Sequence, residues 1–297
     1  MSYQFVDQWH KKAGTVTVGR LCRVLGVSRS GYYGWRQRTR LTPKVGLLGT
    51  QLKAEFAASG RVYGSRRLCA VLRARGLRIG RYRVRRLMRE HRLRALWRRK
   101  FVHTTDSSHA LPVSTNVLAR RFNPSGPNQA WVSDITHIRT RSGWLYLAVV
   151  LDLYARKVVG WAMAPTLHAE LVCAALQLAI AQRQPAPGLM VHSDRGSQYA
   201  SALHQALLAR HGLVGSMSGK GNCWDNAVME RFFLSLKTER VWQRDYANHA
   251  EATVDIADYI VGFYNSVRLH SKLGNLPPNA FEQQWAITQP IAVSEKS

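Results

Sequence analysis

Acidic residues are scarce in this chain, whose 297 residues include 17 Asp and Glu against 43 Lys and Arg, a formal net charge of +26. The chain also lacks any run of about 18 apolar residues, the length that a membrane-spanning helix needs. Its first residues do not have the layout of a signal peptide. We therefore expect no membrane partner and a cytoplasmic location. Such a charge indicates a polyanionic partner.

Cysteine is sparse as well. The chain has no C-x-x-C pair and no cysteines beside histidines at zinc-finger spacing, because its four cysteines are scattered as Cys22, Cys69, Cys173 and Cys223. This pattern excludes a disulfide framework and a structural zinc site, and it fits a reducing compartment. A hydrophobic content of 46% is enough for a folded core, which excludes wholesale disorder.

Charge is unevenly distributed along the chain. Residues 1–120 carry 27 Lys and Arg and 4 Asp and Glu, whereas residues 121–297 carry 16 and 13. A basic half joined to a nearly neutral half indicates one part that grips nucleic acid and another with a different task. Composition and pattern predict five segments: a helix-turn-helix-like segment (1–42), a basic helical DNA-binding domain (43–102), a linker (103–126), a core with a C-terminal helix (127–285) and a tail (286–297).

Two helical regions are expected in the basic half. Within residues 16–38, Gly26 can form the turn after one short helix and Ser28 can cap the next, which predicts a helix-turn-helix element. Contact with DNA and plain packing of a helical hairpin are both open for this element. In the second region, Ser65 is expected to cap a helix that runs to Gly76. Another helix is expected from Arg81 to about Leu96, with an apolar core at helical spacing formed by Leu68, Val71, Leu72, Val84, Leu87 and Met88.

Arginines occupy most of the remaining positions of this second region. A solvated helix face is the alternative interpretation, but such a face normally mixes charges, and Glu90 is almost the only acid here. The surface is therefore expected to bind phosphates. The side chains that we expect to contact DNA are Arg66, Arg67, Arg81, Arg85 and Arg86.

The second half has an α/β pattern. Three β-rich runs separated by short turns, Trp131–Ile138, Trp144–Leu151 and Lys157–Met163, predict an antiparallel meander. Helices and strands then alternate along His168–Gln184, Gly188–His192, Ala200–Arg210, Leu213–Met217, Asp225–Val241 and His249–Tyr264. This order is that of the ribonuclease-H-like fold, a mixed five-stranded sheet with helices. The predicted fold class is thus α/β, preceded by a basic all-α region.

Acidic residues are scarce, so three acids in unexpected places stand out. Asp134 is in the middle of a strand, where a carboxylate is disfavoured unless it is paired or liganded. Asp194 ends a short strand, and the ends of strands are where α/β sheets place their chemistry. Glu230 lies one turn into a helix, away from the apolar stripe. Taken singly, Asp134 could be an ion-pair partner, Asp194 a turn cap and Glu230 a solvated residue.

Together the three acids match what two-metal phosphodiester chemistry requires. Carboxylates that hold two hard cations about 3.5–4 Å apart clamp the attacking and leaving oxygens. We therefore expect Asp134, Asp194 and Glu230 to be catalytic and to bind two Mg²⁺ ions, with Mn²⁺ as a substitute. Lys237 follows Glu230 by seven residues, or two helical turns, and can reach a DNA phosphate from the same face. The alternative for Lys237 is a plain surface lysine.

Other candidates are expected to be structural or to touch DNA. Asp152 is predicted to start a turn and Asp225 to cap a helix, while His192 and His137 are predicted to be core or supporting groups. Asn226 is expected to contact DNA.

The motifs that contain these acids identify a family. Three segments resemble the catalytic core of retroviral-integrase-like (DDE) bacterial insertion-sequence transposases, namely Trp131–Thr136, His192–Tyr199 and Asn222–Phe233. That family places 35 residues between its second Asp and its Glu, and 35 residues separate Asp194 from Glu230 here. The likeness is greatest to the group with two overlapping reading frames, of which this chain resembles the second-frame product. Val62–Leu68, Arg85–Met88 and the stretch from Tyr264 to Phe281 resemble the flanking parts of these proteins, although Leu269 replaces the proline usual in the tail.

The resemblance implies an integrase catalytic core, Mg²⁺ dependence and transposition through a circularised intermediate. The implied partners are double-stranded DNA, as the element's terminal inverted repeats and as the target, a homo-oligomer on that DNA and the upstream-frame product. It also implies DNA contacts by Lys220, Tyr264, Asn265, Arg268 and His270.

We therefore expect a transposase that cleaves DNA 3′ ends and transfers strands. Two alternatives stay open, namely a non-catalytic DNA-binding regulator of the element and a structure-selective nuclease with the same fold. The basic helical half favours end-specific binding of duplex DNA over structure-selective cleavage, and carboxylates kept inside the core argue against a regulator.

Overall fold

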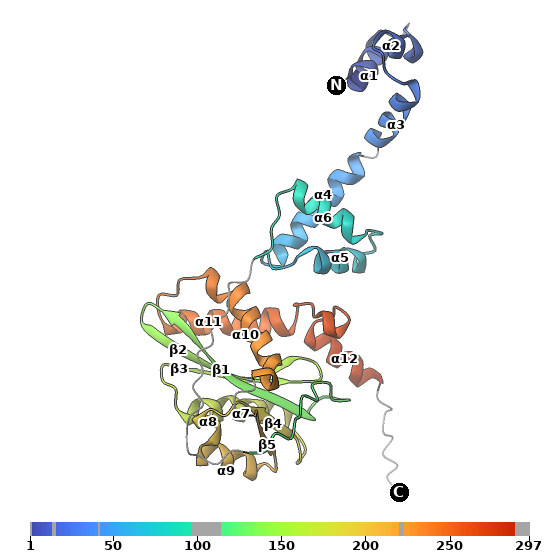
Figure 1. Cartoon of the computed structure of the whole chain (residues 1–297). Helices are drawn as coiled ribbons and strands as arrows, with labels where there is room; N and C mark the ends of the chain where they lie inside the picture. The colour runs from blue at the N-terminus through green and yellow to red at the C-terminus, as the bar shows by residue number, and fades with distance from the viewer. Residues whose placement is uncertain (1, 14–15, 41, 97–113, 220–222, 289–297) are drawn as a thin grey trace. The chain divides into compact units, whose positions relative to one another are not determined.

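The computed structural model describes residues 2–13, 16–40, 42–96, 114–219 and 223–288. The chain forms two compact units, residues 1–95 and 96–297 (Figure 1). The first unit is all-helical and the second is α/β, so the predicted fold class is confirmed. Within the described residues, no helix is both long enough and apolar enough to span a bilayer.

The first unit begins with α1 (Ser2–Ala13), α2 (Val18–Val24) and α3 (Arg29–Arg40). The turn between α2 and α3 contains Gly26 with a φ of +62°, a conformation that glycine adopts without steric cost. The Ser28 hydroxyl accepts a hydrogen bond from the Gly31 N–H at 3.1 Å, as expected of a cap. A small core of Val6, Val18, Cys22 and Tyr32 holds the three helices together.

Three further helices complete this unit, α4 (Thr42–Ala58), α5 (Ser65–Ala74) and α6 (Arg81–Glu90). The cap predicted at Ser65 is wrong, because the N-cap of α5 is Gly64 and Ser65 is already helical. The second helix ends at Glu90 and not near Leu96, because the backbone turns left-handed at Arg92, with a φ of +54°. The predicted apolar positions are buried except for Val71, which is half-buried.

The second unit contains a five-stranded sheet in the order β3-β2-β1-β4-β5. The antiparallel meander is formed by β1 (Ala130–Thr140), β2 (Gly143–Asp152) and β3 (Lys157–Ala164). Strands β4 (Met190–Ser193) and β5 (Val214–Met217) add to the other edge in parallel with β1. The mixed sheet agrees with the predicted order of elements.

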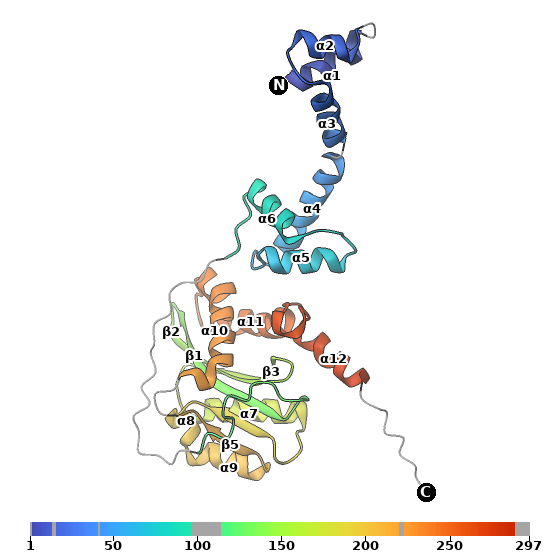
Figure 2. The ribbon, with the colours of Figure 1, turned by 45° about the vertical axis from the view of Figure 1, so that its right-hand side comes forward.

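Helices cover both faces of the sheet (Figures 1 and 2). One face packs on α7 (Ala169–Arg183), α8 (Ser197–Ala200) and α9 (Ala202–Arg210), and the other on α10 (Ala227–Glu239) and α11 (His249–Asp258). Two separate apolar cores result, one on each side of the sheet. An acid on the sheet can point toward either of these cores.

The remaining elements are short or lie toward the C-terminus. The short 3₁₀ helices are η1 (Cys223–Asn226), η2 (Val241–Gln243) and η4 (Ser271–Leu273). Helix α11 continues directly as the π-helix η3 (Tyr259–Asn265), and α12 (Pro278–Thr288) ends the described chain.

Part of the predicted linker belongs to the folded core. Residues 103–113 of that linker lie outside the described residues, but residues 114–126 pack on the second unit. Leu118 is only 1% exposed and is a member of the core on the α10 side. The prediction failed because the polar composition of this stretch hides one buried anchor.

Candidate active site

The strand register brings Asp134 next to Asp194. Strands β1 and β4 are parallel, with Val132 opposite His192. Continued by two residues, this register sets Asp134 on β1 opposite Asp194, which directly follows the last residue of β4. Neighbouring strands are about 4.8 Å apart, and side chains two residues apart point to the same face. The two aspartates are therefore adjacent on one face of the sheet.

That face is the one covered by α10. Alternate residues of β1, including Val132 and Ile138, pack in the same core as Phe232 and Leu236 of α10. Asp134 shares their parity and so faces α10. Glu230 lies in the first turn of α10 and is half-buried. The three predicted acids come from two strands and one helix that meet on this side of the sheet.

The other two acids act on the pKa of Asp134. Burial raises the pKa of Asp134 well above its usual range, and the negative charges of Asp194 and Glu230 raise that pKa further. The Ile135 N–H, which donates to Asp134 at 2.8 Å, and the ammonium of Lys237 act in the opposite direction. Ionised carboxylates held this close repel one another unless cations are bound between them.

Lys237 is also part of this region. Loss of solvation lowers the pKa of Lys237, and the charge of Asp134 opposes this change. Lys237 also lowers the pKa of His137, for which burial is the larger cause. The ammonium therefore lies beside the acids on the same helix that carries Glu230.

The donor set suits a hard divalent cation. Carboxylate oxygens are the ligands that Mg²⁺ prefers, and the set contains no thiolate or imidazole. Within the described parts of the chain, no three His, Cys, Asp or Glu side chains gather closely enough to hold a single metal ion. The fold thus assembles the three acids on one face without closing them around one point.

The turn after β4 orients the side chain of Asp194. Its Oδ1 accepts a hydrogen bond from the Gly196 N–H at 2.9 Å. A Cβ at Gly196 would lie 3.0 Å from that oxygen, so glycine permits the close approach of the carboxylate. Helix α8 begins directly afterwards, which keeps the turn short.

Two buried residues, Ser133 and Tyr199, support the strand that carries Asp134, and no role was predicted for them. The Tyr199 hydroxyl lies 3.0 Å from Ser133 Oγ on the opposite face of β1. Burial raises the pKa of Tyr199, as do the charges of Asp134 and Asp194. Their positions in the sequence could have indicated this role, because Ser133 directly precedes Asp134 and Tyr199 follows Asp194 by five residues.

His192 and Asp152 have the structural roles that were expected. His192 is fully buried, its ring nitrogens lie near two serine hydroxyls, and burial lowers its pKa to about 4. Asp152 accepts hydrogen bonds from the N–H groups of Asn128 and Tyr154 and from the indole of Trp131.

Asp225 does not cap α10, contrary to the prediction. The N-cap residue is Asn226, which makes no capping bond with its side chain. Asp225 is 2% exposed and accepts hydrogen bonds from other segments. The amide of Asn226 is also buried, and among the described residues neither its oxygen nor its nitrogen has a hydrogen-bond partner. Its contact with DNA stays a prediction, and Lys220 lies outside the described residues.

Three C-terminal residues predicted to touch DNA are structural instead. Tyr264 is 3% exposed and packs in the core on the α10 side. The side-chain amide of Asn265 bonds to both backbone groups of Val158 at the sheet edge. Buried Arg268 forms an ion pair with Glu239 at 2.7 Å. These side chains are used inside the fold and cannot also present themselves to DNA.

His270 differs from these three. It is half-buried and packs edge-on against the ring of Tyr264, with the ring centroids 4.9 Å apart. Its contact with DNA stays a prediction.

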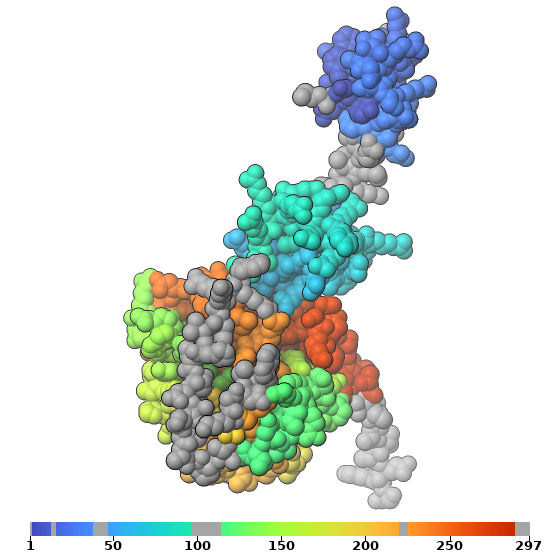
Figure 3. All heavy atoms as spheres, in the orientation of Figure 1, coloured from blue at the N-terminus to red at the C-terminus, as the bar shows by residue number. Residues whose placement is uncertain are grey.

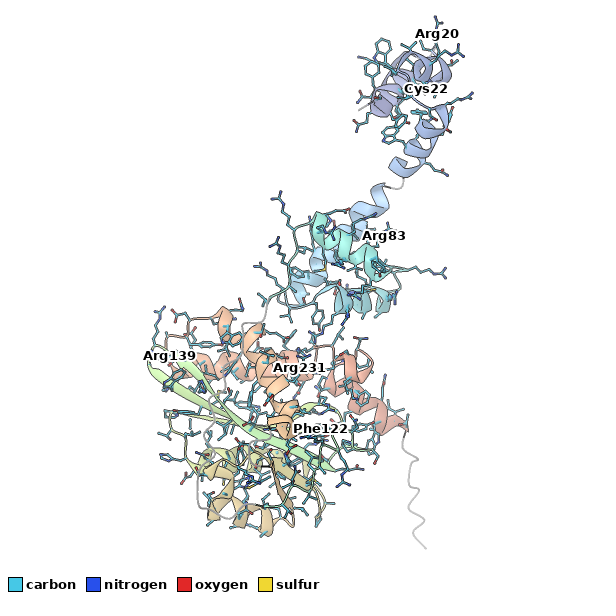
Figure 4. The ribbon with its side chains drawn as sticks, in the orientation of Figure 1. Arg20, Cys22, Arg83, Phe122, Arg139 and Arg231 are labelled. Atoms are coloured by element: carbon cyan, nitrogen blue, oxygen red, sulfur yellow. The ribbon has the colours of Figure 1, made fainter. Side chains whose placement is uncertain are left out.

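The predicted DNA-binding arginines are on two helices of the first unit. Arg66 is exposed at the start of α5, and Arg67 lies over the ring of Tyr63 at 5.4 Å. On α6, where Figure 4 labels Arg83, the side chains of Arg81, Arg85 and Arg86 are exposed. Arg85 also lines a hollow with Ser65, Met88, Arg89, Arg92, Leu93 and Arg94. A concave surface rich in guanidinium groups suits phosphate, and the individual DNA contacts stay predictions.

Comparison with known families agrees with this architecture. Two families described as Integrase core domain match residues 124–223 and 211–278. A family described as HTH-like domain matches residues 47–101. The matched ranges cover the α/β core and the second group of basic helices.

Whole-chain relatives are transposon proteins. The chain is 43% identical over 288 residues, 96% of its own length and 99% of the relative's, to the transposase InsF for insertion sequence IS3A of Escherichia coli (strain K12). It is 43% identical over 267 residues, 89% of its length and 98% of the relative's, to the insertion element IS600 uncharacterized 31 kDa protein of Shigella sonnei. A solved structure of the HTLV-2 integrase catalytic core domain in complex with magnesium is 15% identical, with a TM-score of 0.43 over 54% of this chain and 99% of that chain. The identity over nearly all of this chain, together with the matched core, shows that the chain belongs to the IS3 family of insertion-sequence transposases, which carry an integrase core domain.

Proposed function

We propose that this chain cleaves DNA at the 3′ ends of its insertion sequence and joins the freed ends to target DNA, with Asp134, Asp194 and Glu230 holding two Mg²⁺ ions. The observation that supports this most directly is the register of β1 and β4, which sets Asp134 beside Asp194 on the face covered by α10. Glu230 comes from that helix, and its charge acts on Asp134.

The residues of the chain have distinct tasks in this reaction. The three carboxylates would hold the cations, which when bound would supply charge stabilisation at the attacked phosphate and activation of water and of the 3′-OH. Lys237 binds a phosphate of the DNA next to the acids. Positioning of the DNA and electrostatic stabilisation account for the rate enhancement, and no covalent enzyme intermediate is needed.

The basic first unit holds the DNA during these steps. Its exposed arginines neutralise backbone phosphates and release counterions, which supplies affinity that depends on salt. Its duplex partners are the terminal inverted repeats and the target. Joining two element ends in one event needs two active sites, so the chain acts as a homo-oligomer on DNA in the cytoplasm. The product of the upstream reading frame is a further partner.

A single assay tests the chemistry. The purified full-length protein is incubated with Mg²⁺ and end-labelled duplexes of the terminal inverted repeat, and the products are separated on sequencing gels. Wild-type protein should produce 3′-OH nicks and joined strands. Asp134→Asn, Asp194→Asn and Glu230→Gln should lose both activities and keep DNA binding in gel shifts.

Asp245→Asn is the matched control. It makes the same chemical change at a side chain that is 73% exposed and paired with Arg141. Full activity is expected of this control. Nicks without joined strands would favour a structure-selective nuclease, and binding without nicks would favour a regulator.

A further inference from the structure

The segment of residues 114–121, here called the clamp, bonds to η1, which runs into the helix that carries Glu230, and to β5, the strand beside β4. It follows the basic unit in the chain and is anchored by Leu118, which is 1% exposed. In Figure 3 the green atoms of this part of the chain lie at the surface of the second unit. The side chains and backbone of the clamp bond to separate parts of the α/β core.

One attachment is to Asp225 at the start of α10. The Asp225 carboxylate accepts hydrogen bonds from Asn116 Nδ2 at 2.8 Å and from Arg120 Nε at 2.9 Å. It also accepts one from the Gly219 N–H at 3.0 Å. Asp225 lies in η1, which runs directly into α10, and it precedes Glu230 by five residues. That distance is about 7 Å along a helix axis.

The second attachment is to β5 and, through Ser216, to β4. Ser216 Oγ on β5 accepts hydrogen bonds from the N–H groups of Val117 at 3.0 Å and Leu118 at 3.2 Å. With its lone pairs engaged in this way, the Ser216 hydroxyl donates to Nδ1 of His192, which is 2.9 Å away. His192 is on β4, two residues before Asp194.

The clamp therefore links the start of α10 to β5 and, through Ser216 and His192, to β4, the strand that Asp194 directly follows. We propose that Asp225, Asn116 and Arg120 are positioning residues, which fix the start of α10 and thereby the place of Glu230 relative to Asp194. This inference rests on the proposed catalytic role of Glu230.

A purely structural role predicts a different result from positioning. The Arg120 side chain is 52% exposed but the Asp225 side chain is only 3% exposed, and without Arg120 that carboxylate keeps its hydrogen bonds from Asn116 and Gly219. Removal of Arg120 should therefore cost a modest amount of stability, about 1–2 kcal/mol, while it loosens the first turn of α10. A loss of rate in protein that stays fully folded at the assay temperature is the signature of positioning.

The experiment uses the full-length protein and matched pairs of variants. Arg120→Ala is compared with Arg210→Ala, which removes the same charge from an exposed position of the second unit outside the clamp. Asn116→Ala is compared with Asn123→Ala, a change at an exposed residue of the following stretch. The measurements are the strand-transfer rate at saturating DNA, the Kd for DNA, the unfolding temperature, and hydrogen–deuterium exchange of the backbone amides 227–231.

Arg120→Ala and Asn116→Ala should lower the rate by about tenfold each, because each loses a hydrogen bond to a charged group. Their Kd should stay at the wild-type value, their unfolding temperature should fall by about 2–4 °C per kcal/mol lost and stay above the assay temperature, and exchange at amides 227–231 should become faster. Arg120→Lys keeps one cationic donor and should recover part of the rate. The two control variants should behave as wild type in all four measurements.

Two results would contradict the proposed positioning role of the clamp. Equal loss of rate in Arg120→Ala and Arg210→Ala would show that general charge acts on DNA, and unchanged exchange at amides 227–231 would show that α10 does not depend on the clamp. The exchange comparison needs no activity. If wild-type protein joined no DNA, the proposed function would fail, and the exchange data would still decide whether the clamp orders α10.

Discussion

Replacement of Asp134 by Asn should stabilise the metal-free protein at neutral pH, although it removes a proposed catalytic acid. Burial and the negative charges of Asp194 and Glu230 raise the pKa of Asp134, so its ionised form is unfavourable in the folded chain. For two carboxylates on neighbouring strands, about 5 Å apart, Coulomb's law with an effective dielectric constant of ~20 gives roughly 3 kcal/mol of repulsion. Asparagine has nearly the same shape and removes that repulsion.

The gain should depend on pH in a defined direction. Because the pKa of Asp134 is raised above 3.8 in the folded protein, the folded state binds its proton more tightly than the unfolded state. Wild-type stability therefore falls as the pH rises from about 3.8 through the raised pKa. Asp134→Asn has no such loss. It should therefore be no more stable than wild type in acid, and its gain in stability should be complete above the raised pKa of Asp134. Scanning fluorimetry in EDTA should show an increase of several degrees at pH 8, since about 1 kcal/mol corresponds to 2–4 °C in a chain of this size class.

Asp152→Asn is the control for this prediction. Burial raises the pKa of Asp152 too, but its oxygens accept N–H groups from Asn128 and Tyr154. Asparagine keeps one acceptor oxygen and leaves a buried donor unsatisfied, which costs about 1–3 kcal/mol, so the unfolding temperature should fall. Mg²⁺ should raise the unfolding temperature of wild type and not that of Asp134→Asn. A decrease for Asp134→Asn at pH 8 in EDTA, like that of Asp152→Asn, would refute the reasoning.

Three further predictions concern packing and DNA binding. Gly160→Ala should destabilise the core by about 3 kcal/mol in urea unfolding, because the new Cβ would lie 2.2 Å from the carbonyl oxygen of Ala175. Arg268→Ala should cost roughly 3–5 kcal/mol in the same assay, because Glu239 would keep a buried charge without its partner. Arg85→Ala should reduce the slope of log affinity against log salt by about 0.9, measured by fluorescence anisotropy with duplex DNA, because one phosphate contact is lost.

Each of these predictions has a control. Gly64→Ala places a Cβ where no atom lies within 4 Å, so its cost should stay below about 1 kcal/mol. Arg210→Ala removes an exposed arginine of the second unit and should change neither stability nor the salt slope. Weaker DNA binding by Arg268→Ala with unchanged stability would restore the original prediction that Arg268 contacts DNA.

The sequence predicted the order of elements because each has a strong local pattern. The meander is marked by β-rich runs between short turns, and α7 is bounded within one residue of its predicted ends. The adjacency of Asp134 and Asp194 could not be predicted in the same way. It depends on parallel pairing across about 60 residues of chain, and nothing local determines that register.

The errors have a common physical cause. Tyr264, Asn265 and Arg268 belong to a recognisable signature, but a signature does not say whether its residues serve packing or binding. Arg268 pairs with Glu239, 29 residues earlier, and the clamp bonds to Asp225 across more than 100 residues. Long-range partners of polar side chains determine their role, and composition alone does not reveal these partners.

The two aspartates of the meander, Asp134 and Asp152, show where sequence reasoning can succeed. Asp152 ends a strand, and the N–H of Tyr154, two residues later, bonds to its side chain, a local arrangement that any Asp-turn pattern suggests. Asp134 lies in mid-strand, where the Ile135 N–H donates to one of its oxygens and the extended strand makes no turn that could satisfy the other. A carboxylate that the local backbone cannot satisfy needs a partner from elsewhere. In this fold the nearest groups are two more acids and a lysine, and only a bound cation would balance such a set.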